Sequence, residues 1–78
     1  MKRFSVKPAI LPIRHTYEKT TTDIEKHMIL GYDDDYIYTS YDGQSYRLER
    51  DNSSLSFHFT LSARQYIENL IRMEENND

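Results

Sequence analysis

The 78 residues carry 13 acidic and 10 basic side chains, for a formal net charge of −3, and include no cysteine. This length gives one small domain, and the lack of cysteine excludes disulfides, thiolate metal ligands and a cysteine nucleophile. Both features favour a binding surface over a catalytic pocket, so we expect a protein that is not an enzyme.

Positive charge is concentrated at the start of the chain. Residues 1–20 carry five bases and one acid, whereas residues 21–78 carry twelve acids and five bases. Because Pro8 and Pro12 lack backbone donors, we expect residues 1–20 to form an extended arm at a sheet edge or partly free. Its apolar side chains make it a candidate for exchange between two copies, giving a homodimer. These side chains are Ile10, Leu11 and Ile13.

The apolar stretch in this arm is short. Residues 9–13 are interrupted by Pro12 and are far fewer than a secretion signal or a membrane span requires. We therefore expect a cytoplasmic protein with no membrane contact.

Residues 21–31 fit two structures. Thr22 and Glu25 have the spacing of a capping box, and Gly31 is placed to end a helix. A strand over residues 25–32 competes with this helix, since it would join the meander that follows. The sequence leaves both open.

The clearest local signal is a β-hairpin. Residues 36–41 and 44–49 are rich in β-prone types and flank Asp42 and Gly43, a pair that supplies the positive φ angles of a type I′ turn. This turn sets the register of the two strands. The predicted pairs are Tyr41 with Gln44, Thr39 with Tyr46 and Ile37 with Leu48 on the core face, and Tyr38 with Arg47 and Tyr36 with Glu49 on the solvent face.

The next segment reads as a strand. Alternation over residues 55–60 places three large side chains inward, toward the core. They are Leu55, Phe57 and Phe59, with Ser56, His58 and Thr60 facing out.

The last segment reads as an amphipathic helix. Ser62 begins it with Gln65 as capping-box partner, and the helical spacing of apolar residues covers residues 62–75, leaving a disordered tail over 76–78. The predicted inward residues are Ala63, Tyr66, Ile67, Leu70 and Ile71. Residues 1–78 thus form one α+β domain, in which a small antiparallel meander of three to five strands over residues 21–60 carries a C-terminal helix on one face.

The most unusual stretch covers residues 23–42, which hold six acids, one lysine and four of the seven tyrosines. Carboxylates along a rigid ridge can imitate phosphates toward a groove rich in Lys and Arg, and Tyr is enriched at interfaces. We expect this surface to bind a basic partner, although the same acids also serve to keep a turn solvated. The predicted contact residues are Asp33, Asp34, Asp35, Asp42, Tyr36 and Tyr38.

Metal and catalytic patterns are weak. Residues 33–35 are not followed by the glycine and terminal glutamate of a calcium loop. The histidines, at positions 15, 27 and 58, are too far apart in sequence to indicate zinc unless folding brings them together. Ser56 and His58 share a strand face but lie about 7 Å apart, too far for a direct hydrogen bond. We expect no metal, cofactor or catalytic residue.

The acidic, Tyr-rich hairpin over residues 33–49 and the capped helix from Ser62 resemble, in overall style, the small host-takeover proteins of lytic phages. This resemblance implies a phage-encoded, non-enzymatic inhibitor that acts as a DNA mimic in the host cytoplasm. Its partner would be a basic DNA-binding protein of the host, such as a nucleoid protein or a nuclease. Two alternatives stay open: a nucleic-acid-binding accessory protein that uses the basic arm, and a structural subunit of a dimer or complex.

Overall fold

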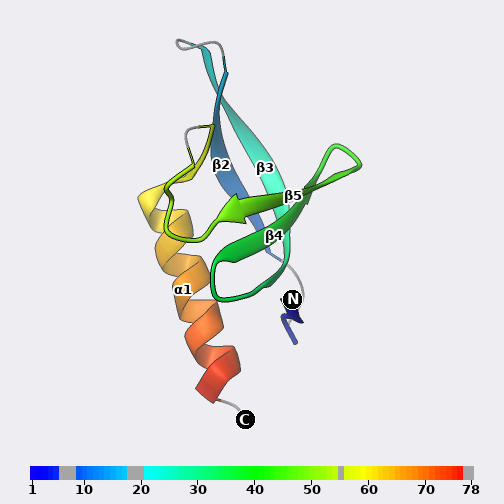
Figure 1. Cartoon of the computed structure of the whole chain (residues 1–78), viewed down its shortest axis with the longest axis vertical. Coiled ribbons are helices and arrows are strands. Elements are labelled where there is room, and N and C mark those ends of the chain that lie inside the picture. The colour runs from blue at the N-terminus through cyan, green and yellow to red at the C-terminus, as the bar shows by residue number, and fades with distance from the viewer. Residues whose placement is uncertain (6–8, 18–20, 55, 77–78) are drawn as a thin grey trace.

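The computed structural model describes residues 1–5, 9–17, 21–54 and 56–76. They form an antiparallel sheet with one C-terminal helix packed against it (Figure 1), which confirms the predicted α+β fold. The strand order is β5-β4-β3-β2-β6, and β1 pairs with β3 beside this path. The elements are β1 (Lys2–Arg3), β2 (Ile10–Tyr17), β3 (Thr21–Tyr32), β4 (Tyr36–Tyr41), β5 (Gln44–Glu49), β6 (Phe57–Phe59) and α1 (Leu61–Asn76).

β2 is an integral strand rather than an arm. It pairs with β3 along its whole length and with β6 at its centre. The amide of Thr16 donates to the carbonyl of Ser56, so the even-numbered residues of β2 turn their backbone away from β3. Pro12 therefore costs no hydrogen bond to β3, and it lies outside the part that pairs with β6. The expectation of an edge or partly free arm is wrong for these residues, because Ile13 is fully buried in the core of its own chain.

The segment over residues 21–31, for which the sequence left helix and strand open, forms a strand, β3. It is four residues longer at its start than the strand we predicted, since β2 pairs with it from Thr21 onward. A bulge between Ile29 and Gly31 shifts the alternation and turns the Tyr32 side chain into the core. A Cβ on Gly31 would lie 2.4 Å from the carbonyl oxygen of Lys2, so this glycine admits β1 instead of ending a helix.

The hairpin of β4 and β5 forms in the predicted register. Asp42 and Gly43 have φ angles of 51° and 77°, as a two-residue type I′ turn requires. All five predicted pairs occur in the ladder. Ile37, Thr39 and Leu48 are buried, so the predicted core face is confirmed.

β6 is shorter than predicted. Phe59 is buried and Phe57 packs against the core, which confirms the inward face, while Leu55 lies outside the described residues. Asn52 satisfies both backbone groups of Phe59: its Oδ1 accepts from the amide at 2.8 Å, and its Nδ2 donates to the carbonyl at 3.4 Å.

The helix begins one residue earlier than predicted. The amide of Ala63 donates to Oγ1 of Thr60 at 3.2 Å, so Thr60 is the N-cap instead of Ser62. A capping box from Thr60 would need Glu or Gln at position 63, and the predicted partner Gln65 is exposed. The helix extends to Asn76, the first residue of the predicted tail, and residues 77–78 lie outside the described part.

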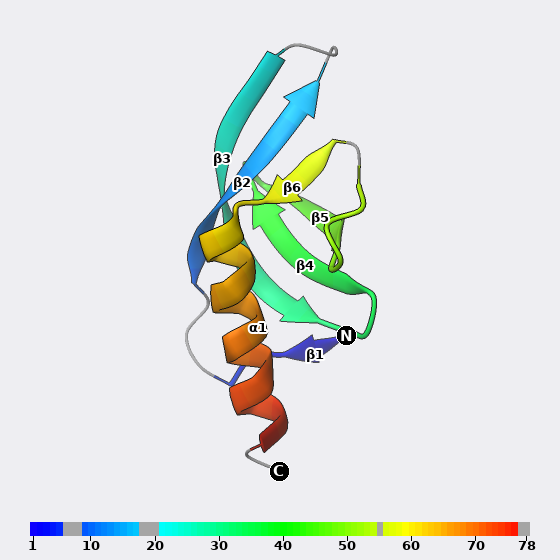
Figure 2. The ribbon, with the colours of Figure 1, turned by 90° about the vertical axis from the view of Figure 1, so that its left-hand side faces the viewer.

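The face that α1 buries is a narrow stripe. Ala63, Ile67 and Ile71 are buried, Leu70 is half-buried, and Tyr66 is 47% exposed, so the prediction of an inward Tyr66 is wrong. Residues four apart lie in one line along the helix, and this single line fills the space over the sheet. In Figure 2, α1 lies in front of the sheet. The core residues contributed by the sheet are Ile13, Ile29, Tyr32, Ile37, Leu48 and Phe59.

Candidate functional site

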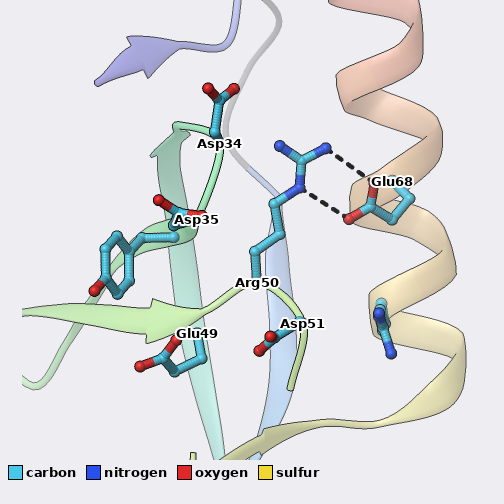
Figure 3. Close-up of a pocket in the computed structure, with 8 residues that line it drawn as sticks. Asp34, Asp35, Glu49, Arg50, Asp51 and Glu68 are labelled. Carbon is cyan, nitrogen blue, oxygen red and sulfur yellow. Dashed lines mark hydrogen bonds and ion pairs between the residues drawn. The ribbon is translucent and has the colours of Figure 1, made fainter. Parts of the chain in front are cut away.

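Acidic side chains from three parts of the chain surround one open hollow beside α1 (Figure 3), which we call the Arg50 pocket. Its volume is about 340 Å³. The turn after β3, the end of β5 and the exposed side of the helix contribute to it, so it exists only in the folded chain. Its lining residues are Asp34, Asp35, Tyr36, Glu49, Arg50, Asp51, Arg64 and Glu68.

Arg50 connects the walls of this pocket. Its Nε and Nη2 donate to the two carboxylate oxygens of Glu68, each at 3.1 Å, and its Nη1 donates to the carbonyl of Asp33 at 2.9 Å. The hydrogen bond to Glu68 raises the pKa of the Arg50 guanidinium above its ordinary value. The backbone amide of Arg50 also donates to the carbonyl of Asp35. One side chain thus connects the end of β5, the β3–β4 turn and α1.

Asp33 builds the β3–β4 turn. Its carboxylate accepts hydrogen bonds from the amides of Asp35 and Tyr36, at 2.9 and 2.8 Å, and from the hydroxyl of Tyr38. The bond from Tyr38 contributes most to lowering the pKa of Asp33, and the same bond raises the pKa of Tyr38. Asp33 and Tyr38 therefore shape the turn, while Asp34 is exposed beside it.

The structure brings only some of the predicted contact residues together. Asp34, Asp35 and Tyr36 line the Arg50 pocket, and the guanidinium of Arg47 covers the Tyr36 ring at 4.3 Å from its centroid. Asp42 follows the far end of β4, six residues after Tyr36 and therefore about 20 Å from it along an extended strand. It does not line the pocket.

Sequence reasoning missed three carboxylates of the pocket: Glu49, Asp51 and Glu68. The acids on either side of Arg50 stand directly after a predicted strand, and that grouping was a usable signal. No sequence signal pointed to Glu68. Its position on the exposed face of the helix does not indicate that the helix packs beside the end of β5.

A second polar cluster lies on the inner face of the sheet. The Glu25 carboxylate accepts from Nδ1 of His15 at 2.8 Å and from Nε2 of His27 at 3.1 Å. His27 is fully buried, and its Nδ1 lies 2.7 Å from Oγ1 of Thr39. Because the carboxylate only accepts, Nε2 of His27 carries a proton and donates it to the hydrogen bond with Glu25. Burial raises the pKa of Glu25, but the bonds from both imidazoles outweigh it and leave that pKa below its ordinary value.

Aromatic rings enclose this cluster. His27 stacks on Tyr41 with centroids 4.8 Å apart, and His15 stacks on Phe57 at 4.2 Å. Folding thus brings together two histidines that the spacing left apart. They meet across the Glu25 carboxylate. Among the residues that the structure describes, no group of three or more His, Cys, Asp or Glu side chains has an arrangement that could hold a metal ion.

The three residues predicted to exchange between copies differ in exposure. Ile13 is fully buried, Leu11 packs partly against the core, and Ile10 is 60% exposed opposite Met28. Of these, only Ile10 presents a largely free side chain on the single chain.

No family model, curated protein or solved structure matches this chain. Within the described residues, α1 is the one helix, and it is too short and too polar to cross a membrane.

Proposed function

We propose that the chain is a non-enzymatic inhibitor of a host DNA-binding protein. The acidic surface around the Arg50 pocket would cover the basic surface with which that protein binds DNA. The observation that carries this proposal is the convergence of five carboxylates from three segments around one hollow. The resemblance to phage host-takeover proteins implies the same kind of partner.

The charges of the pocket favour a cationic partner. Arg50 and Glu68 neutralise each other, which leaves four carboxylates against the single guanidinium of Arg64. Such a surface attracts Lys and Arg side chains and speeds their encounter at low salt. The four carboxylates outside this ion pair belong to Asp34, Asp35, Glu49 and Asp51.

The pocket is also held in shape without a partner. The amide of Arg50 donates to the backbone carbonyl of Asp35 at 2.9 Å, and the amide of Asp33 donates to the backbone carbonyl of Tyr36 at 3.0 Å. A surface that is already ordered loses less conformational entropy on binding. Tyr36, held under Arg47, supplies flat contact area beside the carboxylates.

The test uses salt, DNA and two matched variants. The immobilised chain is exposed to host lysate, and each captured DNA-binding protein is purified and its affinity measured at low and high salt. We expect capture that salt weakens and duplex DNA displaces. Replacing Asp34, Asp35 and Asp51 with Asn should reduce affinity at least about tenfold and flatten its salt dependence. The control replaces Asp23 and Asp42 with Asn and Glu74 with Gln, which changes the net charge by the same three units outside the pocket lining.

Two results would overturn this proposal. One is equal affinity of the triple variant and the wild type for the captured protein. The other is direct retention of nucleic acid by the chain, lost when Lys2 and Arg3 are replaced with Ala, which would favour the accessory protein that binds nucleic acid.

A further inference from the structure

Part of β3 has a neighbouring strand on one side only. β2 pairs with residues 21–28 of β3, whereas β4 pairs only with residues 28–32. Figure 1 shows β2 and β3 continuing together as a two-stranded ribbon beyond the β4–β5 hairpin. Within the described part of the chain, the first seven residues of β3 therefore form an open edge.

The direction of the backbone groups at this edge follows from the ladder. The amide of Ile29 donates to the carbonyl of Ala9 at 2.9 Å, on the β2 side. Since successive residues of a strand turn their backbone groups to opposite sides, the odd-numbered residues bond to β2. Thr22, Ile24 and Lys26 turn their N–H and C=O groups to the open edge. These three residues offer three donors and three acceptors, spaced every second residue, which is the spacing at which an antiparallel extended chain forms hydrogen bonds.

Side chains along the same edge alternate in character. Ile24 is 56% exposed on the outer face, next to the exposed ammonium group of Lys26. On the inner face, Asp23 is exposed and the Glu25 carboxylate lies between its two histidines. The order is thus acid, apolar, acid, base.

We propose that this edge binds an extended segment of a partner protein, which adds an antiparallel strand to β3. The matching segment places an acid opposite Lys26, an apolar residue opposite Ile24 and a base opposite Asp23, because directly opposite side chains are in contact. The charged neighbours of Ile24 hinder unselective pairing and admit a chain of complementary charge.

A second copy of the chain is a poor occupant. In a two-fold antiparallel pairing about Ile24, Asp23 of each copy would lie opposite Glu25 of the other. Two such acid pairs repel each other. The edge is also separate from the Arg50 pocket, which faces α1, so this inference does not depend on the proposed inhibitor function.

The experiment measures amide hydrogen exchange of the full chain by NMR. The probe is the blocked peptide Thr-Glu-Lys-Val-Arg-Thr, whose Glu and Val align with Lys26 and Ile24. We expect saturating peptide to slow exchange at Ile24 and Lys26 at least about tenfold, while Glu25, already bonded to β2, changes little. A control peptide with N-methyl groups on Val and the last Thr keeps the side chains but loses two backbone donors, and it should give no protection.

A charge exchange tests the side-chain alignment. Lys26→Glu should weaken the probe at least about tenfold, and a peptide with Lys in place of its Glu should restore binding to that variant. The proposal is overturned if the probe leaves exchange unchanged, or if these amides are already protected in the free chain. Protection that rises with protein concentration would identify a second copy as the occupant, which also contradicts the proposal.

Discussion

Arg50 and Glu68 meet through two parallel hydrogen bonds, each 3.1 Å long, that join the end of β5 to the middle of α1. Both side chains are only partly exposed, so solvent screens this ion pair less than an ordinary surface pair. The pair forms one wall of the Arg50 pocket and also helps to hold the helix on the sheet.

Arg50→Lys should destabilise the fold by about 1 kcal/mol, because lysine cannot make the two-pronged contact with Glu68 or reach Asp33 at the same time. Urea unfolding at neutral pH measures this change. Arg72→Lys, on the exposed face of the same helix, is the control and should change little. Equal losses for the two variants would show that the contact to Glu68 adds no stability.

Glu25→Gln should destabilise the chain at neutral pH by about 1–3 kcal/mol, since the amide can accept from only one of the two imidazoles with its single oxygen. The folded-state pKa of Glu25 lies below its ordinary value of 4.5. The ionised carboxylate therefore stabilises the fold above this value, and the contribution is lost as the pH falls through the folded pKa.

The difference in stability between wild type and Glu25→Gln should thus shrink on going from about pH 6 to about pH 3, as measured by urea unfolding across that range. Glu75→Gln, an exposed residue near the end of the helix, provides the baseline. A difference that stays constant or grows over the same range would contradict the assigned role of Glu25.

Tyr38→Phe should raise the pKa of Asp33 toward its ordinary value, because it removes the largest of the hydrogen bonds that lower this pKa. An NMR titration of the Asp33 side-chain carboxyl carbon gives the measurement. Tyr36→Phe is the matched control, since the amide of Tyr36, and not its hydroxyl, donates to Asp33. An unchanged pKa of Asp33 in Tyr38→Phe would mean that the amides of Asp35 and Tyr36 alone lower this pKa.

Gly31→Ala should detach β1 from the sheet. The added carbon would lie 2.4 Å from the carbonyl oxygen of Lys2 and 2.8 Å from Cγ of Met1, and the backbone contact has no flexible atom that can yield. Backbone NMR signals of Lys2 and Arg3 should move toward values typical of an unpaired chain. Gly43→Ala has free space but a φ of 77°, so it should cost about 1 kcal/mol and leave the β1 signals in place.

Parts of the molecule could be predicted because their causes are local. The register of the hairpin follows from Asp42 and Gly43, whose positive φ angles fix which residues face each other. The helix could be predicted from the spacing of its apolar residues. That spacing did not predict how narrow the buried stripe is, since Tyr66 is exposed. Asp34, Asp35 and Tyr36 were identified as surface candidates because they lie in or beside one turn.

The remaining features depend on contacts between distant segments. Thr22 and Glu25 permit a helix by local pattern, yet pairing with β2 and the burial of Ile29 make the segment a strand. The Arg50 pocket needs Glu68 to pass beside the end of β5, and the Glu25 cluster needs β2 and β3 in register. Local propensity and turn chemistry in the sequence determined the hairpin and the helix. The pocket, the histidine cluster and the open edge of β3 were decided only by tertiary structure, because strand pairing and helix placement are set by the burial of the whole core.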